Sequence, residues 1–548
     1  MSTLQELADL LFPNVTETPE DLERRYPERG LPEGARVVRI APSPTGYLHL
    51  GVLFTATVNF LTARASKGVF YFRLEDTDKK REVDGGAADI LAGLRRYGLS
   101  IDEGYEAPGK ETGNYGPYRQ SDRAPLYHVF AKSLLLQGLA YPCFCTAEEL
   151  DAVRAGQEEK KLRTGYYGEY ASCRALTPEQ AIEKIKAGQP YVLRLRSPGD
   201  ESRRVKFDDV IKGTIEMPEN DQDIVLLKSD GIPTYHFAHA VDDHLMRTTH
   251  VIRGDEWIAS VPIHLQLFRV LGFKPPKFAH VSPIMKDEGG GKRKLSKRKD
   301  PEAAVHFYAE QGYPADSVQE YLLTIANSDY EEWRRCNADK PRSAFPFNLK
   351  KMSVSGALFD LNKLNDVSKN VIATMDADAV LEAVLAWSRE HDTALYEKLS
   401  ADLDFARGIF AIDRGGPKPR KDLARWNEVP AYTAYFFERP TEFPWPEQLA
   451  ADDIRAILAA YADVYDPAQD KQAWFDTIKA LCPALGFCPE IKEYKKDPTG
   501  YKGHAGDVST VIRVAVTGRR NTPDLCGIMS LLGKDEVTAR LTAAADTL

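Results

Sequence analysis

The sequence predicts an α/β protein, with a parallel sheet in the front half of the chain and helices in the rear half. Three observations predict this fold. A strand, a loop, a helix and a second strand follow one another over residues 36–78, as in a β-α-β unit. Mixed helices and short strands then fill residues 121–235, as expected of an inserted α/β lobe. Beyond about residue 300 the pattern becomes helical up to the C-terminus.

The β-α-β unit is predicted element by element. The run VVRIA after Arg36 is short and β-branched, which favours a buried strand. The prolines and glycine of PSPTG predict a rigid loop. Apolar residues at i, i+4 and i+7 from Phe54 predict an amphipathic helix that ends at Gly68. In VFYFRLEDTD, alternation is expected to point Phe70 and Phe72 inward, before three acids close the strand.

Composition excludes several classes of protein. The chain has 548 residues, with 72 Lys and Arg against 81 Asp and Glu, so its net charge is −9. This acidity argues against coating nucleic acid by net charge alone, although it allows a local basic face. No apolar stretch is long enough to cross a bilayer, and the N-terminus lacks the basic flank of a secretory signal. Seven scattered cysteines are not a disulfide framework. We therefore expect a cytoplasmic enzyme without a membrane segment.

Two segments are candidates for a phosphate site. His49 lies in PSPTGYLHLG, residues 42–51, where a loop turns into a helix whose free N–H groups suit phosphate. KRKLSKRK, residues 292–299, places six positive charges after three glycines, and such a loop can close over a triphosphate. Taken singly, the first could be a turn with a structural histidine, and the second a solvated basic face or a localisation signal. Their joint presence favours a nucleotide site.

These segments resemble a known family. PSPTGYLHLG resembles the HIGH region of class I aminoacyl-tRNA synthetases, and KLSKR resembles their KMSKS loop. RLEDTD at 73–78 and YHFAHAVDDHLM…THVIRGDEW at 235–257 narrow the resemblance to bacterial-type glutamyl-tRNA synthetases. It extends from about Arg36 to the C-terminus. It implies a Rossmann-type catalytic domain with an inserted acceptor-binding lobe, followed by all-α anticodon-binding domains.

The resemblance also implies the activity and the site. The reaction would be ATP-dependent attachment of L-glutamate to the 3′ end of tRNA-Glu through glutamyl-adenylate, with release of AMP and pyrophosphate. Mg²⁺ would accompany ATP. His49 and Lys297 would be catalytic. The implied glutamate-binding residues are Arg39, Ser43, Glu75, Tyr235, His239 and Arg253. The implied ATP-binding residues are His49, Gly51, Glu256, Lys294 and Lys297. His239 stands where some members of the family have Asn.

The expected domains follow from the resemblance and the composition. They are an N-terminal extension (1–35), two halves of the catalytic domain (36–120 and 236–290) around the lobe (121–235), a KMSKS and stem-contact region (291–380) and anticodon-binding helices (381–548). The extension has no predicted role. The exposed-looking charges that could meet tRNA are Arg203, Arg204, Lys206, Arg420, Lys421, Arg519 and Arg520. A monomer is the family-based expectation.

Cys143, Cys145 and Cys173 overlie a zinc site of some relatives. A structural zinc ion needs four ligands, and Cys173 is not followed by the histidine found there. Tyr167 and Tyr170 are close in sequence but lie at an unfamiliar offset. Metal-free thiols are therefore expected, with zinc as the alternative.

Four other activities fit the sequence less well. A glutaminyl-tRNA synthetase shares the two motifs, but RLEDTD and the helical rear half match the glutamate branch. A truncated relative that glutamylates a modified base would be far shorter. A catalytically inactive tRNA-binding paralogue is disfavoured by His49, Glu75, Arg253 and Lys297. A small-molecule nucleotidyltransferase would not need the helical half.

Overall fold

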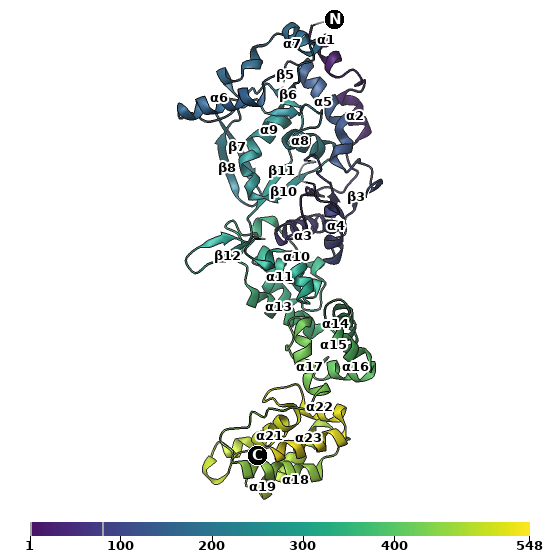
Figure 1. Cartoon of the computed structure of the whole chain (residues 1–548), viewed down its shortest axis with the longest axis vertical. Helices are drawn as coiled ribbons and strands as arrows, with labels where there is room; N and C mark the ends of the chain where they lie inside the picture. Colours follow the sequence, from purple (N-terminus) through teal and green to yellow (C-terminus); the bar gives the residue numbers. More distant parts are fainter. Residues whose placement is uncertain (1–2, 79–81, 297) are drawn as a thin grey trace. The chain divides into compact units, whose positions relative to one another are not determined.

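The computed structural model describes residues 3–78, 82–296 and 298–548. The chain divides into two compact units (Figure 1). The first comprises residues 1–307 and 319–360, and the second comprises residues 308–318 and 361–548.

The first unit holds all strands found in the described part of the chain. These are β1 (Val37–Ile40), β2 (Val69–Phe72), β3 (Glu103–Ala107), β4 (Lys110–Thr112), β5 (Ala140–Cys143), β6 (Val192–Leu195), β7 (Arg204–Asp209), β8 (Gly213–Pro218), β9 (Val225–Leu227), β10 (His250–Gly254), β11 (Lys277–Val281), β12 (Met285–Asp287) and β13 (Lys292–Lys294). Its helices include α1 (Thr3–Leu11), α2 (Pro19–Arg25), α3 (Leu50–Ala65), α4 (Gly86–Arg96), α5 (Ala124–Leu136), α6 (Ala147–Glu159), α7 (Pro178–Lys186), α8 (Tyr235–Leu245), α9 (Val261–Val270) and α12 (Tyr330–Cys336). Helices α10 (Val305–Glu310) and α11 (Ala315–Ala326) straddle the division between the units.

The predicted β-α-β unit is present. Strand β1 pairs in parallel with β2, with Val37 opposite Val69, and α3 connects them. Gly68 is required after the helix, because a Cβ there would lie 1.9 Å from the Arg36 carbonyl oxygen. The expected one-sided alternation in β2 is wrong: all four of its residues are buried, including Tyr71. Strands of a parallel sheet are covered on both faces, so alternation is lost.

The parallel strands form the predicted Rossmann-type core. β2 pairs in parallel with β3, and β10 pairs in parallel with β11. The two pairs meet where the Thr249 backbone N–H donates to the Val37 carbonyl oxygen at 3.0 Å. The spatial order is therefore β3-β2-β1-β10-β11. The carboxyl ends of β1, β2 and β10 share one edge, where ligands bind in open α/β sheets.

The segment expected to form the inserted lobe divides between two sheets. β5, β6 and β9 form a separate antiparallel sheet. The hairpin of β7 and β8 instead extends the main sheet, because β7 pairs with β11. Residues 204–218 thus belong to the sheet that carries the site.

The N-terminal extension, which has no role predicted from the sequence, belongs to the first unit and packs on its strands and helices. Tyr26 Oη donates to the Gly116 carbonyl oxygen at 2.8 Å. The Arg29 guanidinium pairs with Glu103 at 2.6 Å and lies 3.8 Å from the Tyr115 ring centroid. Lys132 of α5 pairs with Asp9 of α1 at 3.0 Å. The extension therefore ties strand β3 to helix α5.

The second unit is helical throughout residues 361–548, as predicted (Figure 1). One core contains Val384, Phe410 and Trp426, and a second contains Ile457, Val511 and Ile528. Its helices are α13 (Leu361–Thr374), α14 (Ala377–His391), α15 (Thr393–Ser400), α16 (Leu403–Ala411), α17 (Val429–Phe437), α18 (Ala451–Val464), α19 (Lys471–Leu485), α20 (Ile491–Tyr494), α21 (Ala505–Thr517), α22 (Leu525–Leu532) and α23 (Lys534–Asp546).

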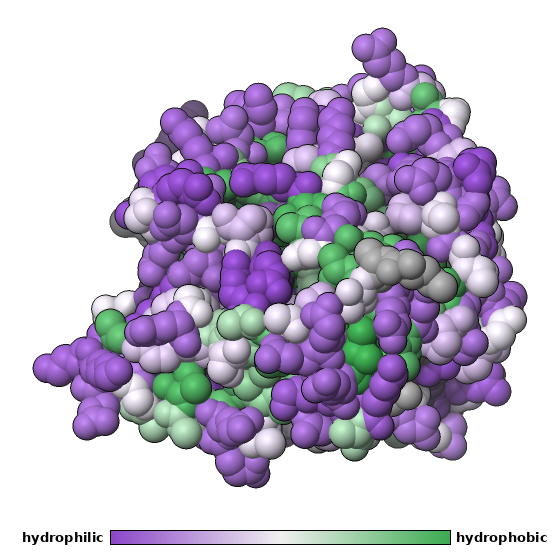
Figure 2. Space-filling model, turned by 90° about the horizontal axis from the view of Figure 1, so that it is seen from above, coloured by the Kyte–Doolittle hydropathy of each residue, from purple (hydrophilic) through white to green (hydrophobic). Residues whose placement is uncertain are grey.

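The face of the molecule in Figure 2 is mainly hydrophilic, with hydrophobic side chains in interrupted patches. Among the described residues, no helix combines the length and the apolar character that crossing a bilayer requires.

Candidate active site

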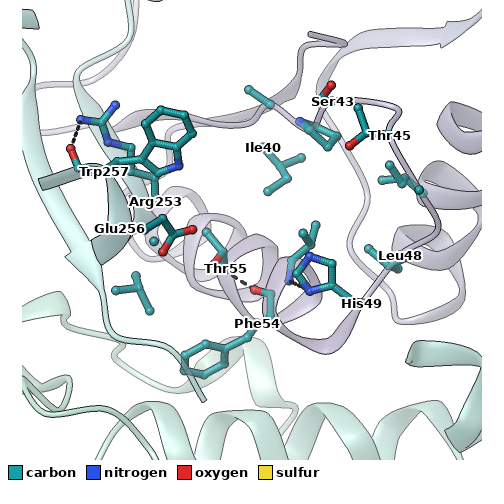
Figure 3. Close-up of a pocket in the computed structure, with 18 of the residues that line it drawn as sticks. Ile40, Ser43, Thr45, Leu48, His49, Phe54, Thr55, Arg253, Glu256 and Trp257 are labelled. Carbon is teal, nitrogen blue, oxygen red and sulfur yellow. Dashed lines mark hydrogen bonds between the residues drawn. The ribbon is translucent and has the colours of Figure 1, made fainter. Parts of the chain in front are cut away.

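A cavity of about 760 Å³ opens at the shared edge of β1, β2 and β10. Figure 3 shows Arg253, Glu256 and Trp257 on one side, Ser43 and Thr45 on the other, and His49 at the start of α3. The residues predicted for the site that line this cavity are Arg39, Ser43, His49, Gly51, Glu75, Tyr235, Arg253, Glu256 and Lys294. One concave site thus collects side chains that lie more than 250 positions apart in the sequence.

His49 is the N-terminal cap of α3. Its Nδ1 atom accepts the Val52 backbone N–H at 3.3 Å. Because that nitrogen is an acceptor, the neutral imidazole carries its proton on Nε2. Gly51 leaves room for this ring, since a Cβ there would lie 3.2 Å from His49 Nδ1. The positive end of the helix dipole and an imidazole N–H donor therefore meet at one point.

Arg253 is a buried cation that forms no ion pair with any described residue. It is the penultimate residue of β10, near the carboxyl end of the strand, and is 6% exposed. Nε donates to His280 Nε2 at 3.1 Å, and Nη2 lies 3.2 Å from His264 Nδ1. Burial lowers the pKa of Arg253. A buried charge without a counter-ion is costly, so this group is prepared for an anion entering the cavity.

Arg39 and Arg73, by contrast, are paired. Both donate to Asp243, Arg39 Nε at 3.2 Å and Arg73 Nη1 at 2.8 Å. Burial opposes the charge of Arg39, but the Asp243 carboxylate outweighs it and raises the pKa of Arg39. Arg39 Nη1 makes no hydrogen bond within the described chain. Arg39 therefore lines the cavity as a cation already balanced by Asp243.

Glu75 and Asp76 both follow strand β2, but only one of them faces the cavity. Glu75 lines the cavity and accepts from Arg73 Nη2 at 2.8 Å. Its burial raises the pKa of the carboxyl group, against the Arg73 charge. Asp76 is structural, because it accepts from Arg119 Nε at 2.6 Å and from the Ser121 backbone N–H at 2.8 Å. Only Glu75 of this pair is presented to a ligand.

His239 does not line the cavity, contrary to its predicted direct contact with glutamate. The side chain is fully buried behind Tyr235, with ring centroids 5.8 Å apart and planes 12° from parallel. Its Nδ1 lies 2.8 Å from Asp243 Oδ2. Position 239 faces inward on α8, so its ring supports Tyr235 and the Asp243 network instead. Tyr235 also packs on Trp257, at 4.4 Å between centroids.

The basic loop begins at the cavity. Lys294 at the end of β13 lines it, whereas Lys297 lies outside the described residues. Asp300 anchors the loop by accepting from both terminal nitrogens of Arg293, at 2.5 and 2.8 Å, and from the Ser296 backbone N–H at 2.9 Å. Hydrogen bonding to Arg293 lowers the pKa of Asp300 well below its usual range, although burial of the carboxyl group opposes this shift.

The three cysteines form a cluster away from the cavity. The sulfur atoms of Cys143, Cys145 and Cys173 lie within 4.8 Å of one another. The Tyr166 hydroxyl lies 3.4 Å from Cys143 Sγ and 3.2 Å from Cys145 Sγ. Neither tyrosine weighed from the sequence makes these contacts: Tyr167 donates to the Arg163 carbonyl oxygen at 2.6 Å and packs on Tyr170. The cluster offers three sulfur donors and one oxygen donor.

Sequence reasoning missed the residues that support the cavity wall. His264 and His280 hold Arg253, and Trp257 packs on Tyr235. Trp257 is the last residue of the motif THVIRGDEW, and that position was the available signal. The histidines lie on a helix and a strand without a local motif, so no sequence signal linked them to Arg253.

Comparison with known proteins gives the family. A model for the catalytic domain of class I tRNA synthetases (E and Q) matches residues 36–366, and an anticodon-binding domain model matches residues 417–545. A glutamate–tRNA ligase of Clostridium perfringens (strain 13) is 49% identical over 543 residues, covering 98% of this chain and 100% of that protein. The chain belongs to the glutamate–tRNA ligase family.

Further members of the family agree. The ligase of Sorangium cellulosum is 47% identical and covers 95% of this chain and 97% of its own length. A glutamate–tRNA ligase from Elizabethkingia meningosepticum, solved in complex with its amino acid, superposes with a TM-score of 0.73. It is 29% identical and covers 94% of this chain and 100% of its own. The predicted class I catalytic domain with a helical anticodon-binding part is therefore confirmed.

Proposed function

We propose that the protein attaches L-glutamate to the 3′ end of tRNA-Glu in an ATP-dependent reaction that passes through glutamyl-adenylate. Family membership supports the overall reaction. One observation supports this cavity as the place of the reaction: the Arg253 guanidinium is buried at its wall without an ion-pair partner among the described residues. A carboxylate of glutamate would supply the missing anion, with bidentate geometry that arginine favours.

The remaining predicted contacts complete a zwitterion site. Glu75 would accept the substrate ammonium, and the unengaged Nη1 of Arg39 would donate to a second carboxylate oxygen. Ser43 would add a hydroxyl donor, and Tyr235 would close the wall. Glutamate carries two carboxylates and one ammonium, for which this wall offers the uncompensated Arg253, the Nη1 donor of Arg39 and the Glu75 carboxylate.

In the first step, an α-carboxylate oxygen of glutamate attacks the α-phosphorus of ATP. The bond from that phosphorus to the bridging oxygen breaks, and pyrophosphate leaves with the electron pair. Nε2–H of His49, the N-terminus of α3 and Lys294 would stabilise the developing negative charge, together with Lys297. Glu256 and Gly51 would contact the nucleotide. ATP would enter as its Mg²⁺ complex, with the ion held largely by phosphates and water.

In the second step, the 2′-hydroxyl of the terminal tRNA ribose attacks the acyl carbon and AMP leaves. Phosphates of tRNA are neutralised by Lys and Arg side chains, and those not already paired with a carboxylate are the better candidates. Arg203 is paired with Glu219 at 2.9 Å, and Arg420 with Asp422 at 2.7 Å, so these two are weakened as candidates. Arg204 and Lys206 are exposed on β7, and we favour them for contact with the acceptor end. A monomer in the cytoplasm remains the expected state.

The cysteine cluster would hold one structural zinc ion. In a tetrahedral site with Zn–S bonds of about 2.3 Å, neighbouring sulfurs lie about 3.8 Å apart. Cys145 Sγ and Cys173 Sγ are 3.6 Å apart, which fits. Tyr166 is the fourth donor that the sequence did not identify. This proposal reverses the expectation of metal-free thiols. The ion would stabilise the lobe and takes no part in catalysis.

Aminoacylation tests the function. Purified tRNA-Glu, ATP and labelled glutamate should give labelled tRNA with the wild-type protein. We expect Arg253→Met to lose at least 100-fold in kcat/KM for glutamate, because two charge-assisted hydrogen bonds of about 1.5–3 kcal/mol each would be lost. Failure of the wild-type protein to charge tRNA-Glu would refute the proposal.

A further inference from the structure

Arg253 is held by two imidazoles instead of a carboxylate. Its Nε lies 3.1 Å from His280 Nε2, and its Nη2 lies 3.2 Å from His264 Nδ1. Both histidines are 0% exposed. They come from different elements, His264 from α9 and His280 from β11. The guanidinium is therefore fixed from two directions.

The hydrogen bonds fix the protonation of both rings. A guanidinium has only donors, so each imidazole nitrogen that faces it must accept. His280 then carries its proton on Nδ1 and donates to Asp209 Oδ2 at 2.6 Å. His264 carries its proton on Nε2 and donates to His236 Nδ1 at 3.0 Å. Burial lowers the pKa of both rings, which keeps them neutral.

Asp209 is itself immobilised. It ends strand β7, and its Oδ1 accepts the backbone N–H groups of Ile211 at 2.9 Å and Lys212 at 2.8 Å. It touches His280 but forms no ion pair with Arg253. The His280 ring thus lies between the Asp209 carboxylate and the Arg253 guanidinium.

The contrast with the neighbouring arginines shows what this arrangement achieves. Arg39 and Arg73 contact the Asp243 carboxylate directly, and their charges are balanced within the protein. A carboxylate at position 264 or 280 would balance Arg253 in the same way and would compete with a substrate anion. Neutral acceptors orient the guanidinium and leave its charge available.

We propose that His264 and His280 are positioning residues for the amino-acid substrate: they fix the Arg253 guanidinium by hydrogen bonds while keeping its charge uncompensated, and Asp209 fixes His280 from behind. This inference rests on the proposed function, because it takes the anion that Arg253 binds to be a carboxylate of glutamate.

The test compares three substitutions at position 280. His280→Gln keeps a neutral acceptor near the position of Nε2, His280→Leu removes it, and His280→Glu replaces it with a charged one. The readout is KM for glutamate and KM for ATP in tRNA-dependent ATP–pyrophosphate exchange. We expect KM for glutamate to change less than about 3-fold in the Gln variant and to rise about 10-fold or more in the Leu variant. The Glu variant should show the largest rise, with KM for ATP within about 2-fold in all three.

Controls separate positioning from folding. His244→Leu removes a partly buried imidazole, which pairs with Glu23 outside the cavity, and should leave KM for glutamate unchanged. If His280→Leu does not fold, the Gln and Glu variants decide, because both keep a polar side chain of equal length.

Two results would overturn the inference: equal rises of both KM values, or a Glu variant that binds glutamate as well as the Gln variant does. Absence of exchange with glutamate in the wild-type protein would instead refute the proposed function, and the two failures are therefore distinct.

Discussion

The different surroundings of Arg253 and Arg73 predict a large loss of stability on substitution of Arg73 and a small change on substitution of Arg253. Arg73 is fully buried and lies 2.8 Å from both Glu75 and Asp243. Arg73→Met would leave these carboxylates buried with fewer partners, and removing one member of a buried ion pair costs about 3–5 kcal/mol. Arg253→Met leaves no carboxylate unpaired. It loses hydrogen bonds to two neutral histidines, worth about 1 kcal/mol each, and relieves an uncompensated buried charge.

The free energy of unfolding should therefore fall by about 3–5 kcal/mol in Arg73→Met and change by less than about 1 kcal/mol in Arg253→Met. Urea denaturation followed by circular dichroism measures both. Methionine is chosen in each case because it fills most of the volume of the arginine stem. If Arg253→Met costs as much as Arg73→Met, the claim that Arg253 is held ready for a substrate anion is wrong.

Three further predictions concern the site and the lobe. Burial raises the pKa of Glu75, so protonation of this carboxylate should lower kcat/KM for glutamate at a pH above the usual Glu range. In Glu75→Gln, kcat/KM should be much lower at every pH and should no longer fall on the acid side. Gly51→Ala should lower the rate of adenylation about 10-fold without changing tRNA affinity, because the added Cβ crowds His49; equal losses in both would contradict this role. Metal analysis should find about one zinc per chain in the wild-type protein and clearly less in Cys145→Ser, whereas metal-free wild-type protein would support free thiols.

Local patterns predicted those parts of the fold that local chemistry determines. The β-α-β unit was predictable because the strand, the PSPTG loop and the glycine terminus each leave a sequence signal. His49 at the start of α3 followed from the same reasoning. Burial of Tyr71 was not predictable by alternation, since helices cover both faces of the sheet.

Local sequence patterns did not predict which segments meet in the folded chain. The β7–β8 hairpin lies within the expected lobe range, yet its pairing partner β11 is about 70 residues further on. His239 was expected in the cavity by motif position, but the orientation of α8 turns it behind Tyr235. Tyr166 was missed because a donor set is defined by distances in space, and offset along the chain was a poor guide. The motifs themselves, 42–51 and 235–257, did bring their residues to one cavity.

The central claim is that this cavity activates glutamate for transfer to tRNA. Its most direct test is ATP–pyrophosphate exchange with purified tRNA, measured in parallel with glutamate and with glutamine. We predict exchange with glutamate and at least 100-fold less with glutamine, because the neutral amide cannot balance the Arg253 charge. Exchange that prefers glutamine, or no exchange with glutamate, would contradict the account.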